Sequence, residues 1–228
     1  MNRSMTARPN TKTAAAQADL FAARTAPVGT APKGTAPEGF AYRPDAVPLA
    51  LEKTLLPIFA TLPFQPFDFH GFLGNRRVVS YGWRYDYGNQ ALRESDPMPD
   101  FLFPLREIAG EFAGIQPERF EQSMVIEYAP GAGIGWHRDK PMFQDVVALS
   151  FLARCRLRFR RKTGSRGIRK TWARADQELA PRSVYLLRGP AREIWEHSIP
   201  ALTELRYSVT FRNFKAKAGS GKGRPGGA

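Results

Sequence analysis

The stretch that decides the fold reads Gly135-Trp136-His137-Arg138-Asp139-Lys140, and it follows a glycine-rich approach over residues 128–134. In an extended strand, side chains two residues apart point to the same side, so His137 and Asp139 project together while Arg138 faces away. An imidazole and a carboxylate placed in this way can give two ligands to one metal ion. The pattern is short, and a solvated turn after a glycine-rich loop can contain the same residues. Whether His137 and Asp139 bind a metal therefore depends on a third ligand elsewhere in the chain.

A second histidine is the partner that this half-site requires. The chain has three histidines, so the candidates are His70 and His197. His197 is favoured because it lies just before residues 206–212, a run with strand-like alternation. In that run Arg206, Ser208, Thr210 and Arg212 share one face, and Tyr207, Val209 and Phe211 share the other. Two guanidinium groups on one face suit a dicarboxylate, although an edge strand with a solvated face would show the same alternation.

Together these residues carry a family resemblance. The set His137-Arg138-Asp139, His197 and Arg206-x5-Arg212, with Tyr128-Ala129-Pro130-Gly131 before it, resembles the AlkB-like 2-oxoglutarate and Fe(II) dependent dioxygenases. The resemblance covers residues 39–213. It implies a mainly β fold with flanking helices (α+β), built on a double-stranded β-helix, or jelly roll. His70 matches no ligand position of the family and is interpreted as structural.

The resemblance also implies a cofactor set and residue roles. Fe(II) would be held by His137, Asp139 and His197, and 2-oxoglutarate and O2 would be the cosubstrates. Arg206 would bind the distal carboxylate of 2-oxoglutarate, and Arg212 would lie by its keto-acid end and the reaction site, which makes it a catalytic candidate with the three ligands. Tyr128 matches a tyrosine that hydrogen-bonds the cosubstrate. Ile126 departs from the family, which often has asparagine two residues before that tyrosine.

The resemblance implies an enzyme that oxidatively demethylates N-alkylated bases in DNA, with succinate, CO2 and formaldehyde as products. Single-stranded DNA, double-stranded DNA and RNA all remain open as substrates. Two alternatives stay beside it. One is the same oxygenase chemistry on RNA or protein, because a fold does not determine a substrate. The other is a non-enzymatic nucleic-acid binding module on the same scaffold.

Composition agrees with one globular domain with flexible ends. The chain has 228 residues, of which 43% are hydrophobic and 12% aromatic, and its net charge is +13. No apolar run approaches the roughly 20 residues of a membrane span, so no membrane partner is expected. The single Cys155 rules out an internal disulfide and is interpreted as a buried apolar residue. We expect a cytoplasmic protein, associated with the nucleoid if the source is bacterial.

Both ends of the chain lack a sustained apolar pattern. Residues 1–38 are expected to form a disordered arm, and residues 214–228 a disordered basic tail. An organellar transit peptide is an alternative for the arm. Within the arm, Gln17-Ala18-Asp19-Leu20-Phe21 resembles the short peptide by which bacterial DNA enzymes dock on the replication sliding clamp; the alternative is a chance cluster.

The most basic segment spans residues 154–174, with ten basic residues and no acidic residue. Basic and apolar residues alternate there, which predicts a strand with one cationic face, and Gly164 to Gly167 would form the turn of a hairpin. A phosphate backbone is the expected partner, and a merely solubilising face is the alternative. The predicted nucleic-acid contacts are Arg156, Arg158, Arg160, Arg161, Lys162, Arg166, Arg169 and Lys170.

The remaining elements are predicted from periodicity. Apolar spacing predicts helices over residues 47–61, broken at Pro57 or starting late, and over 101–112. Residues 76–83, 124–128, 146–151 and 183–187 are predicted strands. By family resemblance, the aromatic residues Trp83, Tyr85 and Tyr87 form a substrate lid that stacks on a flipped base; an aromatic core edge is the alternative.

Overall fold

A computed structural model describes residues 36–69, 72–86, 90–166 and 168–216. The chain divides into a unit of residues 1–33 and a unit of residues 34–228, and all described residues belong to the second unit. His70, Tyr87 and the peptide Gln17 to Phe21 therefore lie outside the described residues. The same holds for most of the predicted arm and tail.

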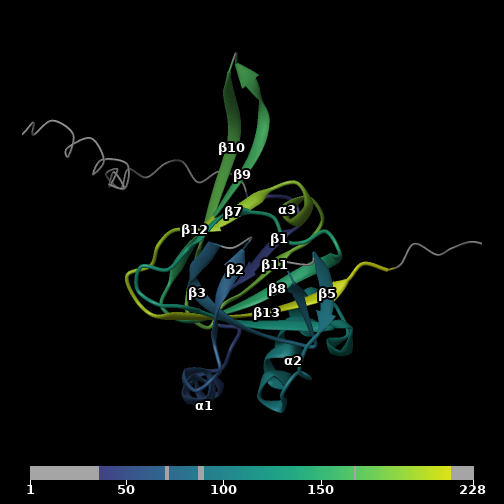
Figure 1. Ribbon diagram of the computed structural model, residues 1–228, viewed down its shortest axis with the longest axis vertical. Helices are drawn as coiled ribbons and strands as arrows, with labels where there is room; N and C mark the ends of the chain where they lie inside the picture. The colour runs from purple at the N-terminus through teal and green to yellow at the C-terminus, as the bar shows by residue number, and fades with distance from the viewer. Residues whose placement is uncertain (1–35, 70–71, 87–89, 167, 217–228) are drawn as a thin grey trace, which may run out of the picture. The chain divides into compact units, whose positions relative to one another are not determined.

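A seven-stranded antiparallel sheet forms the centre of the described unit (Figure 1). Its order is β1-β11-β8-β13-β6-β3-β2, so strands far apart in sequence lie side by side. The bounds are Phe40–Arg43 for β1, Gln65–Phe69 for β2, Phe72–Tyr81 for β3, Gln122–Tyr128 for β6, Phe143–Leu152 for β8, Val184–Leu187 for β11 and Arg206–Phe214 for β13.

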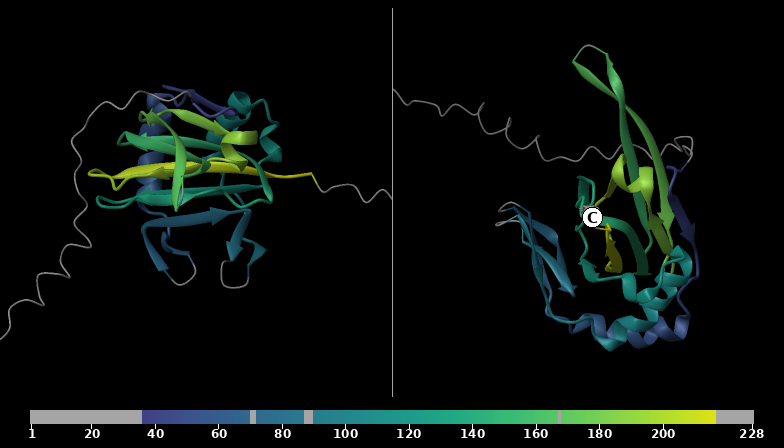
Figure 2. Two further views of the ribbon diagram at one scale, coloured as in Figure 1. Left: turned by 90° about the horizontal axis from the view of Figure 1, so that it is seen from above. Right: turned by 90° about the vertical axis from the view of Figure 1, so that its right-hand side faces the viewer.

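A four-stranded antiparallel sheet of order β10-β9-β12-β7 lies against one face of the larger sheet. Its strands are β7 (Ile134–His137), β9 (Cys155–Arg166), β10 (Arg169–Leu179) and β12 (Glu196–Ile199). β12 pairs with β9 only as far as Arg160, and beyond that point β9 and β10 continue as a two-stranded hairpin (Figure 2). A separate two-stranded sheet joins β4 (Trp83–Asp86) and β5 (Ala91–Glu94). Two facing antiparallel sheets confirm the predicted jelly roll.

Three layers follow from the pattern of buried side chains. Helices α1 (Leu49–Ala60) and α2 (Phe103–Ala113) pack on the outer face of the large sheet, and the four-stranded sheet packs on its inner face. In β13 the odd residues 207, 209 and 211 join the helix side of the core, as the alternation predicts. The even residues face the inner layer, where Arg206 is fully buried. The short elements are α3 (Gly189–Glu193), η1 (Asp100–Leu102) and η2 (Pro117–Arg119).

Helix α1 corrects one expectation, because it continues through Pro57 without a break. Proline removes one helical hydrogen bond, to the carbonyl four residues earlier at Lys53. Lys53 and Pro57 are both exposed, so water can satisfy that carbonyl. Leu55 and Phe59 are buried on the opposite side and hold the helix against the sheet.

The turn of the hairpin is a second correction. Gly164 was expected at the turn, but it lies within β9, where it pairs with Thr171. β9 continues to Arg166 and β10 begins at Arg169, so the connection is shorter than the expected one. A β-bulge between Thr171 and Trp172 shifts the register and accommodates the extra residue.

The described helices were compared with the length and hydropathy of a membrane-spanning helix. None of those in the described part of the chain has the length and hydropathy that a bilayer crossing requires. Cys155 is buried and free, as the sequence predicts.

We expect Gly82→Ala to destabilise the fold strongly. Gly82 has a φ of +75°, and an added Cβ would lie 2.1 Å from the carbonyl oxygen of Glu121. Gly114 is the matched control, because its φ is +65° and nothing lies within 4 Å of its Cβ position. Both variants bear the cost of a left-handed residue, and only Gly82→Ala adds a clash, so it should lose about 1–3 kcal/mol more. Urea unfolding measures the difference; equal losses would contradict the clash.

Candidate metal centre and cosubstrate site

Three predicted ligands meet between the two sheets. Strand pairing places His197 of β12 directly opposite His137 at the end of β7, and Asp139 follows two residues later, just past that strand. The potential ligand atoms of these three residues all lie within 4.8 Å of one another. The Nε2 of His197 is 3.5 Å from Oδ2 of Asp139. The chemistry and spacing of this donor set fit one Fe(II) ion, with open positions for a cosubstrate and O2.

Hydrogen bonds orient the ligands for metal binding. The Nδ1 of His137 lies 3.0 Å from the carbonyl oxygen of Gly135. A carbonyl oxygen only accepts, so Nδ1 carries the hydrogen and Nε2 keeps the lone pair that a metal needs. Arg212 donates to Oδ1 of Asp139 from Nε at 3.3 Å and from Nη2 at 3.2 Å. This leaves Oδ2 of Asp139 facing His197.

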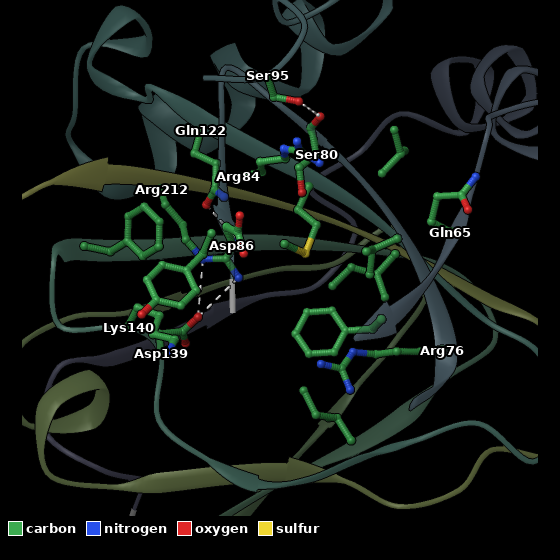
Figure 3. A pocket seen from close by; sticks show the side chains of 18 of the residues that line it. Gln65, Arg76, Ser80, Arg84, Asp86, Ser95, Gln122, Asp139, Lys140 and Arg212 are labelled. Carbon is green, nitrogen blue, oxygen red and sulfur yellow. Dashed lines mark hydrogen bonds and ion pairs between the residues drawn. The ribbon is translucent and has the colours of Figure 1, made fainter. Parts of the chain in front are cut away.

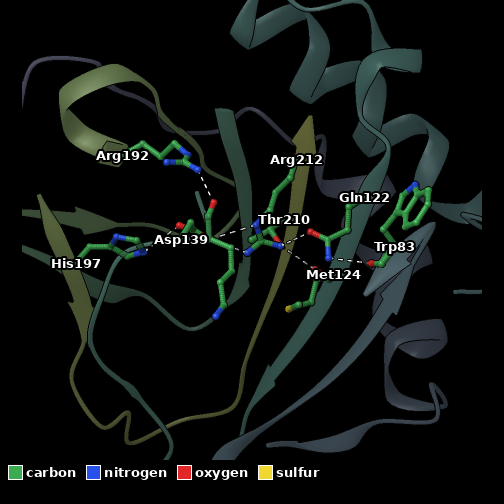
Figure 4. A network of polar contacts seen from close by, with 9 residues as sticks. Trp83, Gln122, Met124, Asp139, Arg192, His197, Thr210 and Arg212 are labelled. Atoms are coloured by element: carbon green, nitrogen blue, oxygen red, sulfur yellow. Dashed lines mark hydrogen bonds and ion pairs between the residues drawn. The ribbon is translucent and has the colours of Figure 1, made fainter. Parts of the chain in front are cut away.

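A chain of polar contacts supports Arg212 in turn (Figure 4). Its Nη1 donates to Gln122 and to Thr210, each at 3.1 Å, and Gln122 Nε2 donates to the carbonyl of Trp83 at 2.9 Å. Arg192, which is 2% exposed, donates from α3 to the carbonyl of Lys140 and so fixes the loop after Asp139. Sequence reasoning missed Gln122 and Arg192, because their roles depend on contacts between distant strands and helices.

The charge state of the ligands is already suited to a divalent cation at neutral pH. Burial disfavours the charged form of Asp139, but Arg212, His197 and His137 outweigh it and lower the pKa of this carboxyl to about 2. Burial, with the neighbouring His137, lowers the pKa of His197 to about 3. Burial likewise lowers the pKa of His137. The site therefore presents one carboxylate and two neutral imidazoles.

These shifts predict how the metal-free protein responds to acid. The pKa of His197 falls from its ordinary 6.5 to about 3 in the folded protein. Between pH 6.5 and 3, His197 is therefore protonated in the unfolded chain but neutral in the folded chain. Stability from this group is therefore present above pH 6.5 and is lost as pH falls toward 3, by up to about 1.4 kcal/mol per pH unit. His197→Gln should gain stability relative to the native chain between pH 6.5 and 4.5 in urea unfolding; a constant difference would contradict this.

Arg206 and Tyr128 provide a place for a carboxylate. Arg206 has no exposed surface, and its guanidinium lies 5.1 Å from the centre of the Tyr128 ring. Its Nη2 donates to Ser150 Oγ at 2.8 Å, while its buried Nε and Nη1 have no hydrogen-bond partner in the described part of the chain. Unsatisfied donors on a buried cation are costly, so these atoms fit the distal carboxylate of 2-oxoglutarate.

A cavity of about 650 Å³ adjoins the metal ligands (Figure 3). Asp139, Lys140 and Arg212 lie at one side of it and Arg76 at the other. Tyr85 lines the cavity, with the Lys140 ammonium 4.0 Å from the centre of its ring. Trp83 packs edge-on against Phe214, at 5.9 Å between ring centres, and does not line the cavity; its part in a substrate lid stays a prediction. Ile126 lines the cavity as an apolar side chain.

The predicted nucleic-acid contacts fall on the hairpin and its base. Arg156, Arg158 and Arg160 lie on the face of β9 that points away from the buried Leu157 and Phe159, as predicted. The sequence shows no acidic residue within the run, but distant ones pair with it: Asp176 contacts Arg156 at 3.6 Å, and Glu196 contacts Arg160. Lys162 and Lys170 are exposed. Arg161 lies over the ring of Trp195 at 5.2 Å. The side chains of Arg166 and Arg169 are outside the described set.

Comparison with known proteins decides the family. The model of the 2OG-Fe(II) oxygenase superfamily matches residues 63–212, which include the three ligands and both arginines. The chain belongs to the 2OG-Fe(II) oxygenase superfamily. It is by family a 2-oxoglutarate-dependent dioxygenase, for which Fe(II), 2-oxoglutarate and O2 are the reagents, and the donor set above fits this chemistry.

Individual relatives of this oxygenase confirm the AlkB-like resemblance. A protein of Arabidopsis thaliana described as an alkylated DNA repair protein ALKBH8 homolog is 31% identical over 183 residues, which are 69% of this chain and 49% of that protein. An uncharacterized protein of Acanthamoeba polyphaga mimivirus is 32% identical over 157 residues, or 60% of this chain and 72% of that protein. This chain thus spans about half the length of the Arabidopsis relative.

A solved structure shows that the fold is shared. The structure of OsALKBH1 matches this oxygenase with a TM-score of 0.54 and 14% sequence identity. The matched region covers 77% of this chain and 96% of the OsALKBH1 chain. The AlkB-like jelly roll predicted from the sequence is therefore confirmed.

Proposed function

We propose that this oxygenase removes alkyl groups from N-alkylated bases in nucleic acid, as a DNA repair enzyme. The observation that carries the proposal is the cavity beside the metal ligands, which combines room for a ring with Tyr85 and cationic side chains. A base must leave its stack to reach such a centre, and an aromatic ring can stack on the flipped base. The description of the Arabidopsis relative as an alkylated DNA repair protein supports the same class of substrate.

Each part of the site has a role in that reaction. His137, Asp139 and His197 would hold Fe(II), which with 2-oxoglutarate and O2 supplies the oxidation that hydroxylates an N-linked methyl group before formaldehyde is lost. Arg206 and Tyr128 would bind the distal carboxylate and so orient the cosubstrate. Arg212 would hold Asp139 and stabilise negative charge near the keto-acid end.

The projecting hairpin would bind the phosphate backbone. Its outer face stacks the guanidinium of Arg160 between Trp136 and Trp172, at 4.5 and 4.4 Å from their ring centres. Trp136 directly precedes the ligand His137, so this basic and aromatic surface begins next to the metal centre. Alternating cations and aromatic rings are typical of surfaces that follow a nucleic-acid strand. The proposed contacts are Arg156, Arg158, Arg160, Arg161, Lys162, Arg166, Arg169 and Lys170.

The direct test is reconstitution with Fe(II) without O2, followed by addition of O2, 2-oxoglutarate and oligonucleotides with 1-methyladenine or 3-methylcytosine. Mass spectrometry then measures succinate and the repaired base in single-stranded DNA, double-stranded DNA and RNA, with His137→Ala as the inactive control. Repaired base in DNA supports the proposal. Succinate with repair in RNA alone, or with no repaired base, would redirect the search to RNA or protein, and absence of succinate would favour a binding module.

We expect Lys162→Ala combined with Lys170→Ala to weaken nucleic-acid binding uniformly across sequences. Both lysines lie on the hairpin, and each phosphate contact that is lost lowers the salt dependence of binding by about one unit of slope. Lys53→Ala is the control, because Lys53 is also exposed but lies on α1. Fluorescence anisotropy over a range of salt concentrations measures the effect. An unchanged slope in the double variant would exclude the hairpin as a phosphate contact.

Two further proposals concern the cellular location of the enzyme and a protein partner. We infer a cytoplasmic site of action and docking on a sliding clamp through Gln17 to Phe21, from the sequence of that peptide. A pull-down with a sliding clamp should lose the native chain's signal when Leu20 and Phe21 are both changed to alanine. Equal binding of the two forms would exclude this docking peptide.

A further inference from the structure

Arg206 is a buried cation without an acidic neighbour in the described structure. None of the ion pairs among residues 36–216 that the structure describes includes it. Its strongest electrostatic partners are Cys155, Tyr128 and Tyr185, which are all neutral groups at physiological pH. A fully buried guanidinium surrounded in this way is a preformed site for an anion.

Strand pairing places Tyr185 on the same inner face as Arg206. Tyr185 of β11 pairs with Ala148 of β8, which pairs with Thr210 of β13. Residues directly opposite each other in antiparallel strands project from the same face, and β13 alternates with a period of two. Tyr185 therefore faces the same space as Thr210 and Arg206. The intervening Ala148 is too small to fill that space.

The hydroxyl of Tyr185 is protonated, and the charge of Arg206 acts on it. Tyr185 is 7% exposed, and burial raises its pKa above the ordinary value against the opposing effect of Arg206, so the hydroxyl stays protonated. Arg206 and then Tyr128 exert the strongest charge effects on it. Its ring packs against Phe40 at 6.2 Å between ring centres. Among the described residues this hydroxyl donates to no hydrogen-bond acceptor, although Tyr185 belongs to the buried core.

Ile126, on the other side of β13, cannot donate a hydrogen bond to an anion at Arg206. Ile126 of β6 pairs with Ser208, so it lines the inner face from the other side of β13. Its side chain is buried and apolar, and it has no hydrogen to donate to a carboxylate. Tyr128 of β6 and Tyr185 of β11 both carry a hydroxyl that can donate, and both project from the same inner face as Arg206.

We propose that Tyr185 is a cosubstrate-binding residue, whose hydroxyl donates a hydrogen bond to the distal carboxylate of 2-oxoglutarate while Arg206 and Tyr128 bind the same group. The three side chains come from β11, β13 and β6 and project from the same inner face of the large sheet, where each is buried. A hydrogen bond to a charged acceptor is stronger than a neutral one, and burial strengthens it further. The inference rests on the cosubstrate that the family uses, and it holds whichever substrate is oxidised.

The test measures binding rather than turnover. The full chain is loaded with Mn(II) without O2, and calorimetry gives the dissociation constants of 2-oxoglutarate and of 2-oxopentanoate, which has a methyl group in place of the distal carboxylate. Tyr185→Phe should weaken binding of 2-oxoglutarate about 10-fold and leave binding of 2-oxopentanoate unchanged. Tyr42→Phe is the matched control: Tyr42 pairs with Tyr185 in the sheet, but its hydroxyl accepts a hydrogen bond from Ala180 N. It should change neither constant.

Three outcomes would overturn the proposal. Unchanged 2-oxoglutarate binding in Tyr185→Phe would show that the hydroxyl makes no contact. An equal loss for both acids would show a general disturbance of the site rather than recognition of the distal carboxylate. A native chain that binds no 2-oxoglutarate would remove the premise. Because no nucleic acid is present, failure of the proposed base demethylation leaves this result unaffected.

Discussion

His197→Ala should abolish metal binding and succinate formation together while the protein stays folded. His197 is one of the three candidate metal ligands, is 6% exposed, and holds its position through pairing of β12 with both β7 and β9. Loss of supporting residues around a metal costs about 10–100-fold in affinity, so loss of a ligand should cost at least about 100-fold. Titration with Mn(II), followed by electron paramagnetic resonance of the free ion, measures the affinity.

Ser198→Ala is the matched control for this experiment. Ser198 is the next residue of β12 and is also buried, but it faces the other side, where its hydroxyl accepts a hydrogen bond from Arg158 at 3.1 Å. This variant should keep native metal affinity. If His197→Ala kept it as well, the ion would be held by other residues and the assignment of the triad would fail. Circular dichroism of both variants shows whether the fold is intact.

Phe59→Ala should cause the largest loss of stability. Phe59 has no exposed surface and joins the helix layer to the large sheet through edge-on contacts with Phe151 and Tyr207, at 5.3 and 5.6 Å between ring centres. Truncating a buried phenylalanine leaves a cavity and costs about 3–5 kcal/mol. Urea unfolding measures the free energy of unfolding.

Leu49→Ala is the control in the same helix. Leu49 is 52% exposed, and exposed substitutions usually change stability by less than about 0.5 kcal/mol. A loss below about 1 kcal/mol for Phe59→Ala would mean that the helices do not share a cooperative core with the sheet.

Local periodicity predicts most of the fold and the metal ligands. The alternation in residues 206–212 correctly assigns the two faces of β13, because side chains in a strand alternate whatever the neighbouring strands are. The ligands are predictable for a related reason: His137 and Asp139 are close in sequence, and His197 is one of only two other histidines.

Features that depend on distant partners could not be predicted. Tyr185 lies in an ordinary apolar strand, and its place near Arg206 follows only from the order β11-β8-β13 in the sheet. The acidic partners of Arg156 and Arg160 come from β10 and β12, so the cationic run looks more isolated in the sequence than it is. Pro57 stays helical because its lost hydrogen bond faces water, which depends on how α1 packs.

Strand β9 has one further consequence, for the evolution of this enzyme. Leu157 and Phe159 pack in the interior with the ligand strands, whereas Arg156, Arg158 and Arg160 point outward. Selection can therefore act on the two sets separately, because substitutions on the outer face leave the packing of the strands that carry the candidate ligands unchanged. A lineage that diverges in this way would keep residues 157 and 159 and vary residues 156, 158 and 160.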